Sequence, residues 1–267
     1  MTVTEKKISR LNNILSESGS AIIACSGGTD SIFLLHQAAG IKGLRLMAVT
    51  IRTPYMPSEE ITAAEGFCKK RGIRHQVIEL PIADEIKNNP GERCYLCKKL
   101  ILKSIMNLAV SEGYDSVFDG SNADDAKEYR PGMKALKESG VRSPLLEASL
   151  TKKEIRKTSK AAGLDTWDKP ANACLLTRFP HGTQITVEEL NKAEKAESFL
   201  ALLGFRGARV RVHGDLARIE FRNEQFRKAL TSTTRRKIAE KMKSIGYRYV
   251  SVDIEGYVTG KMNNKSS

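Results

Sequence analysis

The first two thirds of the chain alternate short apolar runs with amphipathic segments. Residues 5–18 carry one apolar stripe at helical spacing, formed by Ile8, Leu11, Ile14 and Leu15. The apolar run at 21–25 is typical of a strand buried on both faces of a parallel sheet. The alternation continues with strands predicted at 44–51, 74–80 and 116–119 and helices at 32–39, 58–72 and about 97–112. This order predicts an α/β fold in which helices lie on both faces of a parallel sheet.

The pattern changes at Thr151. Thr151 and Glu154 have the spacing of a capping box, which predicts a helix over residues 151–164. After an irregular stretch at 165–186, the pattern predicts a small α+β region, with helices at 187–203 and 224–243 and strands at 208–213, 216–221 and 247–254. We therefore predict two domains, 1–180 and 181–267, and a frayed tail.

Composition narrows the class of protein. The chain has 267 residues, of which 40% are hydrophobic, and its 20 glycines and 8 prolines are too few for a collagen-like or low-complexity chain. It has no apolar run of about 18 residues, and its N-terminus is polar and amphipathic, unlike a signal peptide. These features predict a soluble, cytoplasmic protein without a membrane partner.

The formal net charge is +13, which suggests an anionic partner. Residues 181–267 hold 17 basic and 10 acidic residues, so the C-terminal third is the more basic region. Such an excess fits a solvated surface, a nucleic-acid site or a site for a phosphorylated small molecule. Aromatic residues make up only 6% of the chain and do not interleave with the basic ones, so stacking on single-stranded bases has little support.

The sequence IIACSGGTDS places two glycines and three hydroxyl side chains between a buried strand and a helix start. Glycines let a backbone approach an anion closely, and the N–H groups at a helix start attract phosphate. The predicted phosphate-binding residues are Ser26, Gly27, Gly28, Thr29 and Ser31. We expect Asp30 to help hold Mg²⁺ or to orient the pyrophosphate. No GxxxxGK[ST] sequence is present, which disfavours an ordinary P-loop kinase or GTPase.

The five cysteines, an odd number, fit metal or sulfur chemistry better than a secreted disulfide framework. Cys94 and Cys97 form a CxxC at the start of a predicted helix, and Cys174 ends the sequence PANAC. A lone CxxC is compatible with zinc, a redox dithiol, an iron–sulfur cluster or reduced thiols without metal. Zinc would need a fourth ligand, whereas three cysteines would leave one iron of a [4Fe-4S] cluster open for sulfide. Cys25 and Cys68 lie in apolar patterns and are predicted to be core residues.

The segment SGGTDS resembles the PP-loop signature SGGxDS of the N-type ATP pyrophosphatases. The resemblance implies that ATP is cleaved between its α and β phosphates and that an acceptor oxygen is adenylated. It further implies that Thr50, Ile51 and Arg52 meet the adenine and that the loop at 119–122, with Gly120 and Asn122, closes over the nucleotide. Asp125 and Asp168 are candidates for contacts with ATP, Mg²⁺ or positioning waters.

Longer motifs occur in a specific order: ERCYLCK, DGSNADDAKEYRPG, VRSPLLEASLTKKEIR, WDKPANACLLTRFPHGTQIT and VRVHGDLARIE. Together they resemble the LarE family of ATP-dependent sulfur-insertion enzymes, which serve nickel-pincer cofactor synthesis for lactate racemase. The resemblance implies that a carboxylate of pyridinium-3,5-biscarboxylic acid mononucleotide is adenylated and converted to a thiocarboxylate, with release of AMP and pyrophosphate. It also implies that Arg209 and Arg211, which alternate on one face of a predicted strand, bind the substrate phosphate, and Arg178, four residues after Cys174, is a further candidate. Without it, an alternating arginine pair on a strand would fit a solvated face.

Two sulfur sources occur in that family. In one, Cys174 would give up its own sulfur, so that each chain works once. In the other, Cys94, Cys97 and Cys174 would hold a [4Fe-4S] cluster that carries a sulfide, and the presence of all three favours this form. A sulfide or persulfide donor and a homo-oligomer based on trimers are also implied. The alternatives are a tRNA thiolation enzyme of the PP-loop superfamily, for which the +13 charge would be the tRNA footprint, and a catalytically silent nucleotide-binding regulator.

Overall fold

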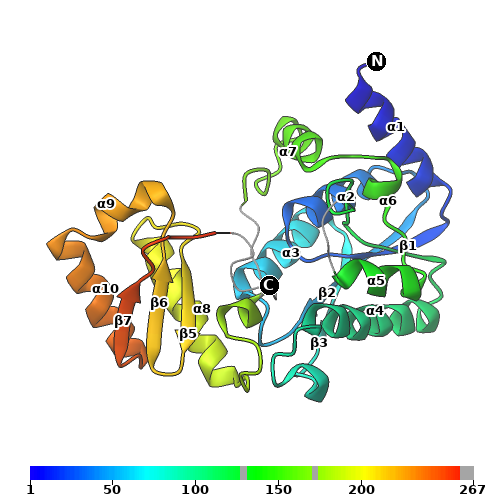
Figure 1. The fold of residues 1–267 in the computed structure, drawn as a ribbon. Coiled ribbons are helices and arrows are strands. Elements are labelled where there is room, and N and C mark those ends of the chain that lie inside the picture. Colours follow the sequence, from blue (N-terminus) through cyan, green and yellow to red (C-terminus); the bar gives the residue numbers. More distant parts are fainter. Residues whose placement is uncertain (127–130, 170–173, 259–267) are drawn as a thin grey trace. The chain divides into compact units, whose positions relative to one another are not determined.

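The computed structural model describes residues 1–126, 131–169 and 174–258 (Figure 1). The chain divides into two compact units. The N-terminal unit comprises Met1–Thr53, Ser58–Pro81 and Glu92–Asn172, and the C-terminal unit comprises Pro54–Pro57, Ile82–Gly91 and Ala173–Ser267. Two short segments from the first third of the chain therefore belong to the unit that contains the C-terminus.

A four-stranded parallel sheet forms the centre of the N-terminal unit. Its strands are β1 (Ser20–Ala24), β2 (Arg45–Arg52), β3 (Arg74–Glu79) and β4 (Ser116–Phe118). The spatial order is β3-β2-β1-β4, and every pairing is parallel, which confirms the predicted α/β fold. From β1 the chain adds two strands on one side and then returns to add β4 on the other. The loop after β1 therefore lies where the strand order reverses, the position at which open α/β sheets bind ligands.

Helices pack on both faces of this sheet (Figure 1). One face packs against α1 (Val3–Ser16), α2 (Thr29–Ala39), α3 (Ser58–Arg71), α6 (Pro144–Glu147) and α7 (Lys152–Ala161). The other face packs against α4 (Arg93–Ser111) and α5 (Pro131–Ser139). Side chains of β1 alternate between the two cores, since Ala21 and Ile23 join the first and Ile22 joins the second.

Several sequence-based boundaries need correction. The second helix was predicted to begin at residue 32, but α2 begins at Thr29, because Gly28 already has the extended conformation of an N-cap. The fourth helix begins at Arg93 rather than near residue 97, so the CxxC lies within it. Helices α5 and α6 were not predicted because each is too short to show a periodic pattern. The capping box of Thr151 and Glu154 is confirmed at the start of α7.

The C-terminal unit contains a mixed three-stranded sheet of β5 (Arg209–His213), β6 (Leu216–Glu220) and β7 (Tyr249–Val252). Strand β6 pairs antiparallel with β5 and parallel with β7. The other elements of this unit are η1 (Asp84–Ile86), η2 (Leu175–Arg178), α8 (Val187–Leu202), η3 (Asn223–Gln225), α9 (Phe226–Ala229) and α10 (Ser232–Ile245). The predicted small α+β region is thus present at this end of the chain.

The single helix predicted over 224–243 is wrong in detail. The chain forms η3 and α9, turns at Leu230, and restarts as α10 with Thr231 as N-cap. The side chain of Thr231 bonds locally to Lys228 O and Thr234 Oγ1, which favours a turn over a continuous helix. Among the described helices, none combines the length and apolar character needed to cross a membrane.

Candidate active site

The loop between β1 and α2 is shaped by its glycine backbone. Gly27 has φ +76°, and a side chain there would collide with the backbone oxygen of Glu60, so only glycine fits. Gly28 is the N-cap of α2, and no side chain of the described residues caps this helix start. Ser26 Oγ lies 3.2 Å from Ser31 Oγ, which also donates to Gly28 O at 3.2 Å. The loop can therefore offer the first N–H groups of α2 to a phosphate.

The loop after β4 packs directly against the start of α2. A Cβ at Gly120 would lie 3.0 Å from the backbone nitrogen of Ser31, so the two backbones approach as closely as glycine allows. Asp119, which is buried, fixes the loop by accepting hydrogen bonds from Ser121 Oγ at 2.7 Å and Ser143 Oγ at 2.6 Å. The structure thus brings together the two loops that the sequence assigned to one site, except for residues 127–130 of the longer motif, which lie outside the described residues.

Two carboxylates meet beside the glycine loop. Asn122, fully buried, donates from Nδ2 to Asp30 Oδ2 at 3.0 Å and from its backbone nitrogen to Asp125 Oδ2 at 3.1 Å. Burial and then the charge of Asp125 raise the pKa of Asp30. Lys152 offsets part of the negative charge through an ion pair of 2.9 Å to Asp125 Oδ1.

Carboxylate and amide oxygens of this kind suit Mg²⁺, which usually takes one or two protein carboxylates and completes its shell with water and substrate phosphates. Within the described ranges, no three His, Cys, Asp or Glu side chains gather closely enough to form a complete metal site by themselves. The donor set at Asp30 and Asp125 therefore fits a shared, phosphate-linked ion. Asp168 is exposed on the surface of the same unit.

The predicted adenine-contacting residues lie at the carboxyl end of β2. The side chain of Thr50 forms hydrogen bonds to neighbouring residues of the sheet: its Oγ1 donates to Cys25 O at 2.8 Å and lies 2.9 Å from His75 Nε2. Ile51 is buried, and Arg52 forms ion pairs with glutamates of α3 and β3. Since β1, β2 and β4 are parallel, this strand end lies at the same edge of the sheet as both loops.

The cysteines fall into two groups. Cys25 and Cys68 are core residues, as predicted, and burial raises the pKa of both thiols, that of Cys68 to about 12. Cys94 is exposed and Cys97 is half-buried in the first two turns of α4, where the three-residue spacing places both residues on one face of the helix. Cys174 is half-buried in the C-terminal unit, directly before η2.

The loop that carries Cys174 is held from within its own unit. Asn89 is fully buried and donates from Nδ2 to the carbonyls of Phe179 and Pro180 at 3.0 and 2.9 Å. Leu175 N donates to Tyr55 O at 2.9 Å. Asn89 was not among the residues predicted from the sequence. Its positive φ of 48° is a conformation that asparagine adopts more readily than most residues other than glycine.

The three predicted phosphate-binding arginines belong to one buried cluster of the C-terminal unit. Arg178 has only 1% of its surface exposed and forms a bidentate pair with Glu197, at 2.7 and 2.8 Å. Arg209 Nη1 lies 3.4 Å from the same carboxylate. Arg211 Nη2 pairs with the fully buried Glu220 at 2.7 Å. A solvated strand face, the alternative explanation of the arginine pair, is excluded because both side chains are buried.

Basic groups outnumber acidic ones in the ion pairs that the described residues form within this cluster. With Arg218, which pairs with Glu220 and Asp253, these pairs comprise four guanidinium groups and three carboxylates. Burial lowers the pKa of Arg209, and the neighbouring guanidinium groups of Arg178 and Arg211 lower it further, against the opposing effect of Glu197. The buried Arg211 Nε has no hydrogen-bond partner among the described residues. An anion at this cluster would supply both negative charge and an acceptor.

Three relatives match nearly the whole chain, although no protein-family model matches it. It is 39% identical over 264 residues to an uncharacterized protein of Synechocystis sp., covering 97% of each chain. It is 34% identical over 255 residues to an uncharacterized protein of Methanocaldococcus jannaschii, covering 94% of this chain and 97% of that protein. It is 34% identical over 245 residues to the pyridinium-3,5-bisthiocarboxylic acid mononucleotide synthase of Lactiplantibacillus plantarum, covering 91% of this chain and 88% of that enzyme. The chain belongs to the LarE family.

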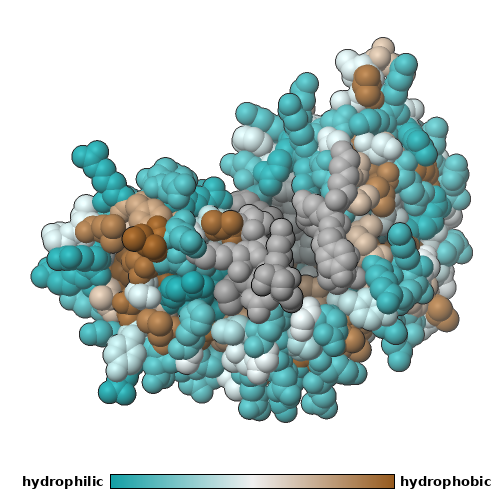
Figure 2. Space-filling model, viewed as in Figure 1, coloured by the Kyte–Doolittle hydropathy of each residue, from teal (hydrophilic) through white to brown (hydrophobic). Residues whose placement is uncertain are grey.

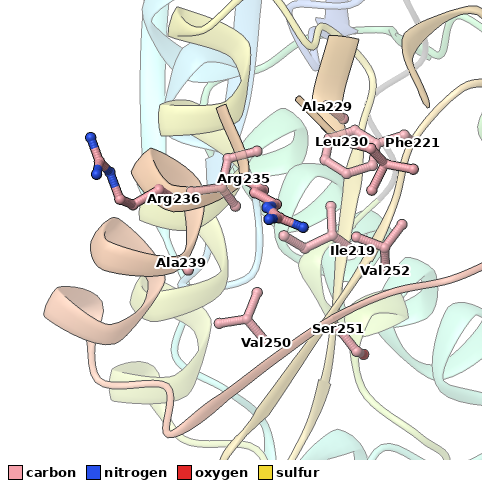
Figure 3. A pocket seen from close by; sticks show the side chains of 11 residues that line it. Ile219, Phe221, Ala229, Leu230, Arg235, Arg236, Ala239, Val250, Ser251 and Val252 are labelled. Atoms are coloured by element: carbon pink, nitrogen blue, oxygen red, sulfur yellow. The ribbon is translucent and has the colours of Figure 1, made fainter. Parts of the chain in front are cut away.

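The C-terminal unit of this LarE-family chain also carries an apolar groove of about 370 Å³ (Figure 3). Figure 2 shows brown, hydrophobic residues gathered over this part of the molecule. Ile219, Val250 and Val252 line the groove from the sheet, while Arg235 and Arg236 extend from α10 at its margin. None of the predicted site residues lines it.

Proposed function

We propose that this protein inserts sulfur into a pyridinium nucleotide at the expense of ATP. It adenylates a carboxylate of pyridinium-3,5-biscarboxylic acid mononucleotide and converts it to a thiocarboxylate for the nickel-pincer cofactor of lactate racemase. The observation that carries the proposal is the 34% identity to the synthase of Lactiplantibacillus plantarum, which extends over 91% of this chain. The glycine loop at the reversal of strand order supports it from the geometry.

Adenylation overcomes the low reactivity of a carboxylate, whose oxygen would otherwise have to leave as oxide. A carboxylate oxygen attacks the α phosphorus, and the bond from that phosphorus to the bridging oxygen breaks, so pyrophosphate departs with the electron pair. In the proposal, the loop at 26–31 binds the phosphates, and Asp30 and Asp125 would hold Mg²⁺. The ion would neutralise the charge of the departing pyrophosphate. The end of β2 and the loop with Gly120 and Asn122 enclose the nucleoside.

Sulfur transfer completes the reaction. A sulfur nucleophile attacks the carbonyl carbon, and the bond to the AMP oxygen breaks, which releases AMP and leaves a thiocarboxylate. In this proposal, the substrate phosphate binds the arginine cluster of Arg178, Arg209 and Arg211. Two observations support it: guanidinium groups outnumber carboxylates in the cluster's ion pairs, and the buried Arg211 Nε has no acceptor among the described residues. Bidentate guanidinium groups match phosphate oxygens well.

We propose Cys94, Cys97 and Cys174 as ligands of a [4Fe-4S] cluster. The donor chemistry fits, since all three are thiols with some exposure and two of them lie three residues apart at the start of α4. Such a cluster, held by three thiolates, would offer an open iron at which a sulfide can bind, so the enzyme could turn over. The sulfide would come from free sulfide or a persulfide donor. In the alternative, Cys174 gives up its own sulfur.

One experiment tests the function and the sulfur source together. Protein is purified without oxygen and incubated with ATP and the biscarboxylate mononucleotide, and pyrophosphate, absorbance and intact mass are measured. We expect pyrophosphate release and a brown protein whose colour is lost in Cys94→Ala, Cys97→Ala and Cys174→Ala. A colourless protein that transfers one sulfur and becomes lighter by the mass of H₂S would show sacrifice of Cys174.

Two further measurements separate the competing classes. Tight tRNA binding that weakens steeply with salt would favour a tRNA thiolase over the proposed enzyme. Binding of ATP without pyrophosphate release on addition of the biscarboxylate nucleotide would favour a regulator. The family resemblance also implies a homo-oligomer based on trimers, which light scattering of the purified protein would test.

A further inference from the structure

A short segment before Cys174 docks onto the glycine loop within the N-terminal unit. Thr29 Oγ1, in the first residue of α2, donates to Thr166 O at 2.6 Å. At the other end of the segment, Lys169 Nζ donates to Gly27 O at 3.3 Å and pairs with Glu60 Oε1 at 3.1 Å. An ammonium group is therefore attached to the same loop that offers N–H groups to a phosphate.

The position of this lysine is fixed by its neighbours. Arg156 donates from Nη1 to Trp167 O at 3.1 Å and from Nη2 to Lys169 O at 2.7 Å. Lys169 N donates to Thr166 O at 3.2 Å, which closes a turn, and Lys160 lies over the ring of Trp167 at 4.4 Å. Because the backbone is held at three places, the ammonium can exchange partners without movement of the segment.

Two other cations near the loop, among the residues that the structure describes, already have partners within the protein. Lys152 pairs with Asp125, and both terminal nitrogens of Arg156 donate to carbonyls. Lys169 differs because its side chain, 19% exposed, contacts the loop backbone itself and retains a donor for a ligand. Its present carboxylate partner, Glu60, carries one negative charge, whereas the triphosphate of ATP carries several and presents more acceptor oxygens.

We propose that Lys169 is a further ATP ligand, which moves from Glu60 to the β and γ phosphates when ATP binds. This inference rests on the proposed function and adds a residue to its site. An ammonium at the pyrophosphoryl part would act where negative charge increases as the α–β bond breaks. Lys169 would therefore contribute both to ATP affinity and to departure of pyrophosphate.

Calorimetric titration with two probes tests the assignment. The probes are α,β-methylene-ATP, which keeps the β and γ phosphates but cannot be cleaved at the bridge, and AMP, which lacks them. We expect Lys169→Met to weaken binding of the methylene analogue about tenfold to a hundredfold, as for loss of a charge-assisted hydrogen bond, while AMP binding changes less than about twofold. Lys157→Met, which removes an exposed lysine of helix α7, should change neither.

Each outcome separates this inference from the proposed function. If the unaltered protein binds the methylene analogue but Lys169→Met binds it equally well, or loses both probes in equal measure, Lys169 is not a β- and γ-phosphate ligand although the proposed function stands. If the unaltered protein binds neither probe, both proposals fail. Lys169→Gln keeps a donor for Gly27 O and guards against a folding defect, and it should show the same selective loss, with Lys169→Arg restoring most of the affinity.

Discussion

Each of the two units contains a candidate anion site, but the groups that would bind the anion differ between them. In the N-terminal unit, the glycine loop offers backbone N–H groups, and its shape depends on the absence of a side chain at Gly27. In the C-terminal unit, buried guanidinium groups provide the charge, and the carboxylates of Glu197 and Glu220 keep those groups paired.

The difference shows which substitutions each site can tolerate. A backbone site depends on φ angles and close approach, so it fails when a Cβ is added. A side-chain site depends on charge balance in a dry interior, so it fails when one partner of a pair is removed. Substitutions at Glu197, Gly27 and Asp30 would test this contrast, and one at Glu154 would test a stabilising carboxylate outside both sites. They follow in order of decreasing expected effect on stability.

Removing the shared carboxylate of the arginine cluster should have the largest effect. Glu197→Gln removes the negative charge that pairs with the buried Arg178 and with Arg209, so we expect a loss of about 4 kcal/mol in the free energy of unfolding by urea. Glu240→Gln is the matched control, because its pair with Arg236 is long, at 4.0 Å, and exposed; it should cost no more than about 0.5 kcal/mol. Equal losses in the two variants would contradict a balanced buried cluster.

Adding one methyl group to the glycine loop should have the next largest effect. Gly27→Ala combines a left-handed backbone with a collision against Glu60 O, so we expect a loss of about 3 kcal/mol and no measurable ATP binding. Gly43→Ala shares the positive φ, at 82°, but meets no atom within 4 Å. It should cost only the backbone strain, about 1 kcal/mol. Calorimetry and urea unfolding of both variants would separate collision from strain.

The start of α7 should give the N-terminal unit part of its acid sensitivity. Burial opposes ionisation of Glu154, but hydrogen bonds from Lys7 and Thr151 prevail and lower its pKa to about 2, from an ordinary 4.5. Because the native state holds the carboxylate ionised, this stabilisation is complete above about pH 4.5 and disappears as the pH falls toward 2. After allowance for solvent screening, Glu154→Gln should lower the free energy of unfolding by about 1 kcal/mol at pH 7. It should also reduce the dependence of that free energy on pH between about 4.5 and 2. Lys7→Met should give a smaller change of the same sign. If the pH dependence of unfolding below about pH 4.5 is unchanged in both variants, Glu154 is not its source.

Asp30 should show the smallest change in stability, with the opposite sign. Its pKa is raised, so the native state holds the proton more tightly than the unfolded chain does, and stability falls as the pH rises through the native pKa. At pH 7, Asp30→Asn should therefore gain less than about 1 kcal/mol in urea unfolding. Pyrophosphate release should nevertheless fall at least about tenfold, because a carboxylate is lost beside the phosphate loop. If Asp30→Asn is less stable than the unaltered protein and fully active, both the stability effect and the role of Asp30 in pyrophosphate release are contradicted.

The backbone site was largely predictable from the sequence. Apolar runs such as residues 21–25 gave the buried parallel strands, and SGGTDS after the first of them gave the loop and its position. Adjacency of that loop to Gly120 and Asn122 followed only from the resemblance, because nothing in the spacing specifies that β4 pairs with β1. Lys169 was missed because a lysine in an irregular segment has no periodic signal.

The side-chain site was less predictable. Alternation placed Arg209 and Arg211 on one face of a strand, but it did not indicate whether that face was buried or exposed to solvent. Burial of the two arginines depends on their carboxylate partners, which lie on other elements: Glu197 on α8 and Glu220 on β6. A glutamate within a helix normally suggests solvent exposure, so Glu197 gave no sign of its role.

The contacts that hold the loop around Cys174 determine which fragments of the protein can keep that loop in place. Its ties to Asn89 and Tyr55 come from segments that precede it by more than eighty positions, within the discontinuous C-terminal unit. A gene fragment that begins at residue 173 would encode the arginine cluster but neither of those ties. Expressed alone, such a fragment should leave the thiol of Cys174 on an unanchored stretch of chain, whereas a permuted gene that carries residues 54–57 and 82–91 along with it could restore the anchor.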